Sequence, residues 1–314
     1  MDVITEETLE IRLATLAVKA PSEREGVFGP HSMRWRVDRE GALFLGAGRA
    51  LLLQLAHPWV AAAVARHSRA LDDPIARFHA TFAVVFAMVF GRLSEALAAA
   101  RALHRRHAVI RGHLGETASN CPASALYAAN DRAALKWVHS TLVETALKTC
   151  ALVRPLNCEE RDGYYAESRR FAGFFGLGPD EVPSDFNAFS AYCDAMVKGD
   201  TLSVGPRARA IATRLLAGAN GGIVVPTWYR ALTAELLPAP LVEAYGLSLG
   251  ARERLLSARA VDLIRRIYPR LPERLRFVGP YHEARERLLG RRPSRLTRIA
   301  NRCWIGQSSM GGHD

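Results

Sequence analysis

The 314-residue sequence lacks the motifs by which several common enzyme classes are recognised. It has no HExxH zinc motif, no GxSxG nucleophile elbow and no P-loop. It has no pair of ExxH motifs, which argues against a ferritin-like di-iron site. Gly46-Ala47-Gly48 precedes a predicted helix, but the preceding strand and the full GxGxxG pattern of a dinucleotide-binding fold are missing. The usual zinc proteases, α/β-hydrolases and nucleotide-binding enzymes are therefore not indicated.

Cysteine and lysine are scarce. The five cysteines are odd in number and no two form a CxxC pair, so we expect neither a disulfide framework nor a structural zinc site. Arginine supplies most of the positive charge behind the formal net charge of +11, and no nucleic-acid recognition motif accompanies it. We therefore expect no nucleic-acid partner. The arginine-rich segment Arg285–Arg298 predicts instead a weak contact with an anionic membrane surface, with nucleic acid as its rival.

Long hydrophobic runs are also missing. The longest, Thr81–Phe90, has ten residues, whereas a transmembrane helix needs about 20. The longer stretch from Ala42 to Val64 is interrupted by charged, polar and helix-breaking residues, which is typical of a core helix. The acidic, polar N-terminus does not resemble a secretory signal. We expect a cytoplasmic protein.

The residues that are abundant favour helices. Hydrophobic residues make up 49% of the chain, alanine, leucine and arginine dominate, and the alternation typical of strands is rare. We predict an all-α fold with an N-terminal arm (1–40), one helical domain (41–290) and a loose basic C-terminal tail (291–314). Gly46 and Gly48 should let backbones approach closely before a helix.

Three helices have clear start signals or periodicity. Asp72-Asp73-Pro74 predicts a helix to Phe90, because aspartate caps helices and proline suits their first position. A second helix runs from Leu93 to about Arg111, and residues 113–129 follow as a loop. Asn130-Asp131 caps a long helix over 133–153.

His107 lies in the centre of an apolar stripe on the second of these helices. The stripe consists of Ala96, Ala100, Leu103, His107 and Ile110. An imidazole in that position needs partners for its ring nitrogens, and a metal, haem iron, a carbonyl or a side chain would each serve. His104 lies towards the edge of the stripe and is the nearest competitor. His139, on the long helix, is better interpreted as a hydrogen-bonded core histidine.

Two further pairs of polar residues are candidates for a site. Arg77 and Thr81 are four residues apart and share one helix face. An arginine there either binds an anion, such as a haem propionate or a carboxylate, or extends to the surface. Gln54 and His57 end an apolar helix just before Pro58, which suits a pocket and a loop contact equally well.

The order of several short motifs is more informative than any one of them. It runs WRV (35–37), GRALLLQLAHP (48–58), HS (67–68), PIARFHATF (74–82), MVFG (88–91), HAVIRG (107–112), YAAND (127–131) and WVHSTLV (137–143). This ordered set resembles the family of bacterial latex-clearing proteins (rubber oxygenases) and MpaB-type oxygenases over about residues 25–280.

The resemblance implies a globin-like helical core around haem b, with His107 as the proximal iron ligand. It also implies that Arg77, Thr81 and Thr141 lie near the haem. Two departures argue against polyisoprene itself as the substrate. Ala80 stands where rubber oxygenases have a lysine, and Ala61–Ala63 offer no equivalent of their proposed catalytic glutamate.

Together these features predict a haem b-dependent oxygenase that uses dioxygen on an apolar alkene, isoprenoid or lipid. His107 is the predicted metal ligand, with Gln54, His57 and Arg77 in the cofactor pocket and Arg77, Thr81 and Thr141 as catalytic residues. The distal wall is predicted to come either from Phe78, Phe82, Val85 and Met88 or from the Gln54–His57 segment. The alternative is a non-catalytic haem- or lipid-binding helical protein of the same fold.

Overall fold

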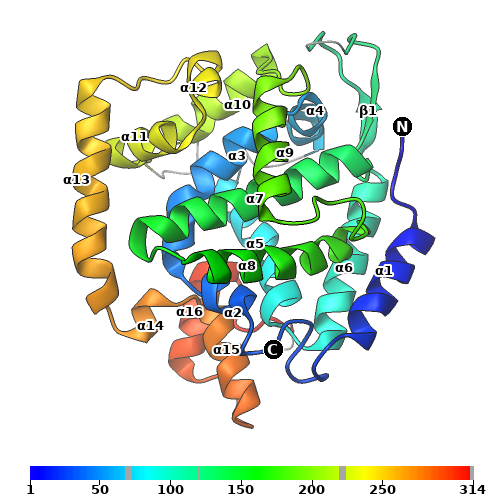
Figure 1. Ribbon diagram of the computed structural model, residues 1–314, viewed down its shortest axis with the longest axis vertical. Coiled ribbons are helices and arrows are strands. Elements are labelled where there is room, and N and C mark those ends of the chain that lie inside the picture. The colour runs from blue at the N-terminus through cyan, green and yellow to red at the C-terminus, as the bar shows by residue number, and fades with distance from the viewer. Residues whose placement is uncertain (68–72, 119–120, 219–223, 312–314) are drawn as a thin grey trace.

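A computed structural model describes the chain except for residues 68–72, 119–120, 219–223 and 312–314. The described residues form sixteen α-helices that pack together, and the only sheet among them has two strands (Figure 1). The predicted all-α class is confirmed, while the globin-like arrangement of the core stays a prediction. Over the described parts of the chain, no helix is long and apolar enough to cross a lipid bilayer.

The first part of the chain contains six α-helices and one 3₁₀ helix. They are α1 (Glu6–Val18), α2 (Met33–Asp38), η1 (Gly41–Gly46), α3 (Ala47–Leu55), α4 (Pro58–His67), α5 (Pro74–Phe90) and α6 (Leu93–Ala108). The middle part contains β1 (Arg111–His113), β2 (Leu126–Ala128), α7 (Arg132–Val153), α8 (Cys158–Phe171), η2 (Ala172–Phe175) and α9 (Phe186–Lys198). The last part contains α10 (Pro206–Ala217), α11 (Thr227–Leu236), α12 (Ala239–Ala244), α13 (Ala251–Ile267), η3 (Tyr268–Arg270), α14 (Glu273–Arg276), α15 (Gly279–Leu288) and α16 (Arg295–Ile305).

Helix α7 crosses the middle of the molecule (Figure 1) and positions much of the rest. The Asp131 carboxylate caps it by accepting a hydrogen bond from the Ala134 amide at 3.0 Å, as its sequence predicts. A Cβ atom on Gly46 would overlap Thr149 of α7, and one on Gly48 would lie 2.5 Å from Thr233 Oγ1 of α11. The predicted close backbone approach at these two glycines is confirmed.

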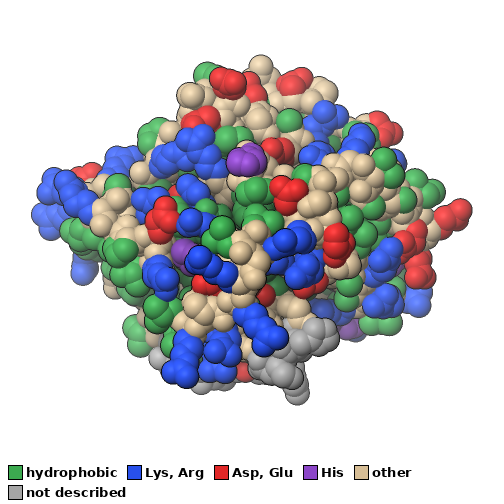
Figure 2. Space-filling model, turned by 90° about the horizontal axis from the view of Figure 1, so that it is seen from below, with side chains coloured by type: hydrophobic (Ala, Val, Ile, Leu, Met, Phe, Trp, Pro, Cys, Tyr) green, Lys and Arg blue, Asp and Glu red, His purple; other side chains and the backbone are tan. Residues whose placement is uncertain are grey.

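The C-terminal segment departs from the prediction of a loose tail. Ser294 caps α16, and the fully buried Asn301 donates from Nδ2 to Glu283 of α15 at 2.6 Å. The prediction was wrong for residues 295–305 because it counted arginines and overlooked this buried polar anchor. Seen from this end of the molecule, Lys and Arg side chains are frequent and hydrophobic ones remain exposed between them (Figure 2).

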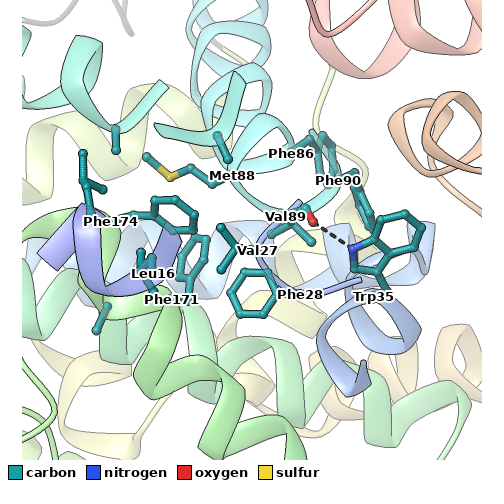
Figure 3. Close-up of a cluster of buried hydrophobic side chains, with 14 of the residues drawn as sticks. Leu16, Val27, Phe28, Trp35, Phe86, Met88, Val89, Phe90, Phe171 and Phe174 are labelled. Carbon is teal, nitrogen blue, oxygen red and sulfur yellow. Dashed lines mark hydrogen bonds between the residues drawn. The ribbon is translucent and has the colours of Figure 1, made fainter. Parts of the chain in front are cut away.

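The main core joins helices from both ends of the chain. Figure 3 shows its part around Trp35, Phe90 and Phe171. Trp35 of α2 packs against Phe90 of α5, and its indole Nε1 donates to the Val89 carbonyl at 2.9 Å. Helix α1 buries Leu9, Leu13 and Leu16 in the same core, so part of the expected N-terminal arm is packed. Another difference lies in the expected loop at 113–129, where β1 and β2 form a short antiparallel hairpin in which Gly112 pairs with Tyr127.

Candidate functional site

A cavity of about 400 Å³ opens between α3, α4, the start of α5, the end of α6 and the first half of α7. Its walls are mainly apolar side chains from α4, α7 and η2. The lining residues are Gln54, Trp59, Val60, Ala63, Val64, His67, Arg77, Arg106, His107, Val109, Ile110, Ala128, Ala129, Ala134, Leu135, Val138 and Phe175. This volume lies within the range of small-molecule sites, and a few polar groups in apolar walls are typical of them.

His107 lines this cavity from the last turn of α6. Removal from water, together with the positive charges of Arg77 and Arg106, lowers the pKa of its imidazole to about 4. The ring is therefore neutral at pH 7. A neutral imidazole keeps a lone pair on one nitrogen, which is the form that binds a metal.

Asn130 is the hydrogen-bond partner of this imidazole. Its side chain hydrogen-bonds the ring and favours the protonated form, as a carbonyl oxygen accepting a ring N–H does. Its Nδ2 donates to the His104 carbonyl at 3.2 Å, which leaves the amide oxygen for His107. Such a second contact fixes the tautomer and orientation of a metal-binding histidine.

Two arginines, Arg77 of α5 and Arg106 of α6, bring positive charge to the cavity. Desolvation lowers the pKa of Arg77, and the neighbouring Arg106 charge lowers it further. Neither guanidinium has an ion-pair partner among the described residues, and none of the described lining residues is Asp or Glu. Two unpaired guanidinium groups at an apolar cavity suit an anionic group on an otherwise apolar ligand.

Gln54 is held in the wall by a residue behind it. Its Nε2 donates to Thr141 Oγ1 of α7 at 3.1 Å, and the Thr141 hydroxyl donates to the Val138 carbonyl at 2.7 Å. Thr141 is fully buried. Its hydroxyl therefore orients the Gln54 amide, and Thr141 itself does not line the cavity.

The structure thus brings together three of the residues singled out from the sequence: Gln54, Arg77 and His107. Thr81 and His57 are not among the lining residues. Thr81 is exposed and donates to the Arg77 carbonyl at 2.9 Å. His57 is buried against Trp59, its Nδ1 has no partner within the described parts of the chain, and desolvation lowers its pKa to about 4.

The two competing histidines also lie outside the lining. His104 contributes its backbone carbonyl to Asn130. His139 is almost completely buried, and its Nε2 donates to the Ser168 carbonyl at 2.8 Å. The interpretation of His139 as a hydrogen-bonded core histidine is confirmed for this nitrogen.

The first of the two predicted distal walls lies elsewhere. Phe82 and Val85 line a separate cavity of about 90 Å³ beside Arg34 and Tyr164, and Met88 is fully buried in the main core. Along α5, Arg77 faces the His107 cavity, whereas residues further along the helix face the smaller cavity and the main core. Of the second predicted wall, the Gln54–His57 segment, Gln54 lines the His107 cavity and His57 does not.

Sequence reasoning missed three residues of the site: His67, Arg106 and Asn130. His67 lines the cavity, and its Nε2 lies 3.1 Å from Tyr127 Oη. Asn130 was interpreted together with Asp131 as a helix cap, but Asp131 alone caps α7. The signal available in the sequence was that one N-cap residue is enough for a helix, so that the Asn130 side chain was free for another contact.

One known family matches most of the chain. The family described as the catalytic domain of ER-bound oxygenase mpaB/B′ and rubber oxygenase matches residues 34–266, about three quarters of the chain. No curated protein and no solved structure matches the chain. Every residue that lines the His107 cavity falls within the matched range. The chain belongs to the family of mpaB and rubber oxygenase catalytic domains.

Proposed function

We propose that this protein is a haem b-dependent oxygenase acting on an apolar alkene, isoprenoid or lipid, with His107 as the proximal iron ligand. The family supports an oxygenase. The observation that carries the haem assignment is the neutral His107 imidazole, which faces an apolar cavity of about 400 Å³ with Asn130 on one ring nitrogen.

The residues around the cavity fit haem b. A haem needs apolar walls, one neutral imidazole and positive charge for its propionates, and the cavity has each of these. The described residues hold no group of three or more His, Cys, Asp or Glu side chains that could bind a metal ion without a porphyrin. One imidazole is sufficient for haem.

Each polar residue then has a distinct role. His107 binds the iron, and Asn130 sets the direction of its ring. Arg77 and Arg106 neutralise the propionates, and Thr81 supports the Arg77 turn through its hydrogen bond. Thr141 orients the Gln54 amide from behind the wall, and the buried His57 packs against Trp59, which lines the cavity. When bound, haem supplies the oxygen chemistry, while the apolar walls bind the substrate and exclude water.

The assignment is tested by absorption spectroscopy of the purified protein after haem addition. We expect a Soret band in the wild type, its loss in His107→Ala, and its retention in His104→Ala. His104 is the matched control because it lies one turn away on the same helix and outside the cavity. A His107→Ala variant with an unchanged Soret band would remove the proposal.

The absence of a carboxylate from the described cavity wall favours a second candidate, a non-catalytic haem- or lipid-binding protein. Ala80 and Ala61–Ala63 stand where rubber oxygenases have a lysine and a proposed catalytic glutamate. Oxygen consumption that depends on both haem and an added alkene would support the enzyme. A Soret band without oxygen consumption would support the binding protein.

A further inference from the structure

A groove of about 630 Å³ lies between α14, α15 and α16, beyond the range that matches the oxygenase family. It is separate from the His107 cavity and shares no lining residue with it. Figure 2 views the molecule from this end. The groove therefore has no role in the proposed oxygenase site.

The groove exposes large aliphatic side chains. Leu275 is 70% exposed, Leu289 63%, Leu296 59% and Ile299 56%, and all four line the groove. On α16, Leu296, Ile299 and Cys303 follow one another at three- and four-residue spacing and form a continuous stripe. A cluster of exposed aliphatic residues marks a surface that binds something apolar.

An arginine stripe runs beside this apolar stripe. Arg295, Arg298 and Arg302 are exposed on the adjoining face of α16 and have no ion-pair partner among the described residues. Arg274 and Arg291 extend the positive charge along the groove lining. In a helix, such neighbouring apolar and basic stripes are typical of segments that lie at a lipid–water interface.

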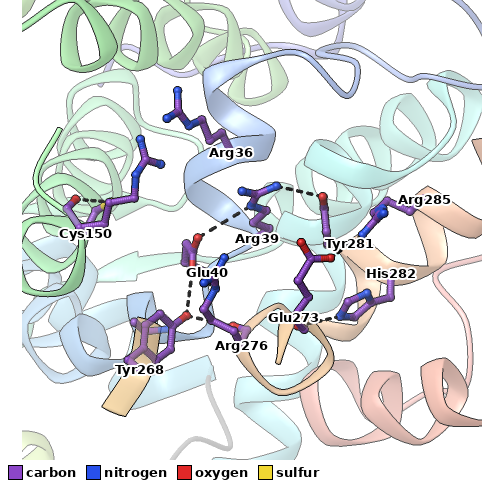
Figure 4. A network of polar contacts seen from close by, with 12 residues as sticks. Arg36, Arg39, Glu40, Cys150, Tyr268, Glu273, Arg276, Tyr281, His282 and Arg285 are labelled. Atoms are coloured by element: carbon purple, nitrogen blue, oxygen red, sulfur yellow. Dashed lines mark hydrogen bonds and ion pairs between the residues drawn. The ribbon is translucent and has the colours of Figure 1, made fainter. Parts of the chain in front are cut away.

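The glutamates of this region do not neutralise that charge. Between Glu273 and Ile305 the sequence has nine arginines and three glutamates. Glu273 pairs with Arg285 at 2.8 Å (Figure 4), and Glu283 binds the Asn301 side chain. Glu286 accepts hydrogen bonds from Ser294 and Thr297 at the start of α16. Among the described residues, none of these carboxylates forms an ion pair with the arginines of the stripe, and arginines outnumber glutamates, so the region keeps a net positive charge.

We propose that this groove and the outer face of α16 dock the protein on an anionic lipid surface. The arginines contact lipid phosphates, while Leu296 and Ile299 enter the acyl-chain boundary. Charge complementarity selects an anionic partner, and the exposed aliphatic groove favours lipid over nucleic acid, whose binding uses phosphate contacts and aromatic stacking. The proposal does not depend on haem binding.

Vesicle co-sedimentation tests the electrostatic part. We expect the full chain to bind vesicles of phosphatidylcholine mixed with phosphatidylglycerol and to leave pure phosphatidylcholine vesicles unbound. The triple variant Arg295→Gln, Arg298→Gln, Arg302→Gln should bind about a hundredfold more weakly. The control removes the same charge from exposed positions of α13: Arg252→Gln, Arg259→Gln, Arg266→Gln. An equal loss in this control would overturn the assignment to α16.

Fluorescence tests the apolar part. Trp304 lines the groove, so vesicles with brominated acyl chains should quench part of the tryptophan emission, and Trp304→Phe should remove that part. Leu296→Ser with Ile299→Ser should abolish the quenching, whereas Leu255→Ser with Leu263→Ser on α13 should not. Circular dichroism checks the fold of each variant. Binding of duplex DNA without binding of anionic vesicles would overturn the proposal in favour of a nucleic-acid surface.

Discussion

Asn130 joins the ends of two helices at the candidate site: its side chain hydrogen-bonds the His107 imidazole, and its Nδ2 donates to the His104 carbonyl. Asn130 is itself buried and directly precedes the Asp131 cap of α7. The direction of the His107 ring is therefore set by how α6 meets α7. An imidazole fixed in this way is oriented before any metal binds.

The first prediction concerns this contact. In Asn130→Ala, the ring of His107 loses the partner that fixes its tautomer, so haem should dissociate roughly 10–100-fold more readily. Transfer of haem to apomyoglobin measures the dissociation rate. Asn187→Ala, which changes an exposed asparagine of α9, is the control. Equal rates in all three proteins would show that Asn130 does not support the ligand.

A second prediction tests whether the charge of Arg77 binds a haem propionate. If Arg77 binds a propionate, the wild type should bind haem more tightly than haem dimethyl ester, and Arg77→Gln should lose roughly tenfold of that preference. Arg105→Gln, on the exposed face of α6, should keep it. Titration of the three apoproteins with both porphyrins provides the six affinities. A preference unchanged by Arg77→Gln would place the propionates elsewhere.

Much of the site's location follows from local sequence signals. Asp73 and Asp131 cap α5 and α7 as their sequences predict, because a cap depends only on residues within one turn. The apolar stripe around His107 likewise places its side chain inward through helical periodicity alone. These signals are short-ranged, and for that reason a single sequence contains them.

Other parts of the site depend on contacts that the sequence does not display. Asn130 meets His107 only because the β1–β2 hairpin returns the chain to the end of α6. Thr141 of α7 accepts a hydrogen bond from Gln54 of α3, which is far away in the sequence. Helix α16 is held to α15 partly by a buried asparagine, Asn301, within an otherwise basic segment. Such pairings arise from tertiary packing, which overrides local composition.

A third prediction concerns the hydrogen bond between Gln54 and Thr141. Thr141→Val keeps the shape but removes the acceptor, so it should lower the free energy of unfolding by about 1–2 kcal/mol. Thr141→Ser keeps the hydroxyl and should cost less. In a Gln54→Leu background the effect of Thr141→Val should shrink, because no amide remains to be left unpaired. Urea unfolding of the wild type, Thr141→Val, Gln54→Leu and the double variant measures this coupling. A coupling of zero would contradict the stated role of Thr141.

A fourth prediction concerns pH. Burial lowers the pKa of His57 and of His139 to about 4, below the ordinary 6.5 that both regain on unfolding. Between these values the unfolded chain binds more protons than the folded chain, so stability falls as the pH drops from about 6.5 towards 4. Each histidine should contribute roughly 3 kcal/mol to this fall. Urea unfolding at several pH values measures it.

Histidine variants assign this pH dependence. His57→Gln and His139→Gln should each flatten the dependence of the unfolding free energy between pH 6.5 and 4, because glutamine does not titrate. His31→Gln, at an exposed position, should leave the slope unchanged. The double variant His57→Gln, His139→Gln should keep only the part due to His107, whose pKa is also lowered to about 4. A slope as steep as that of the wild type would assign the pH dependence to other groups.

The last prediction concerns the close approach of α3 and α11. A Cβ on Gly48 would lie 2.5 Å from Thr233 Oγ1 and 3.0 Å from its Cγ2, inside the core. Gly48→Ala should therefore lower the free energy of unfolding by about 1–3 kcal/mol, although alanine is the better helix former. Gly163→Ala, in α8, is the control, because its nearest neighbour is 3.4 Å away at Met33 Cγ. It should stabilise the protein by about 0.5–1 kcal/mol.

A second substitution distinguishes overlap from any other effect of Gly48→Ala. The Thr233 hydroxyl is buried and has no hydrogen-bond partner in the described structure, so Thr233→Ala removes the obstacle without breaking a hydrogen bond. In the Gly48→Ala, Thr233→Ala double variant the new methyl group occupies the space that the threonine vacates. Most of the lost stability should then return, and thermal unfolding of the two single variants and the double variant measures it. If the two losses simply add, the helices have separated, and the contact at Gly48 is not what holds α3 against α11.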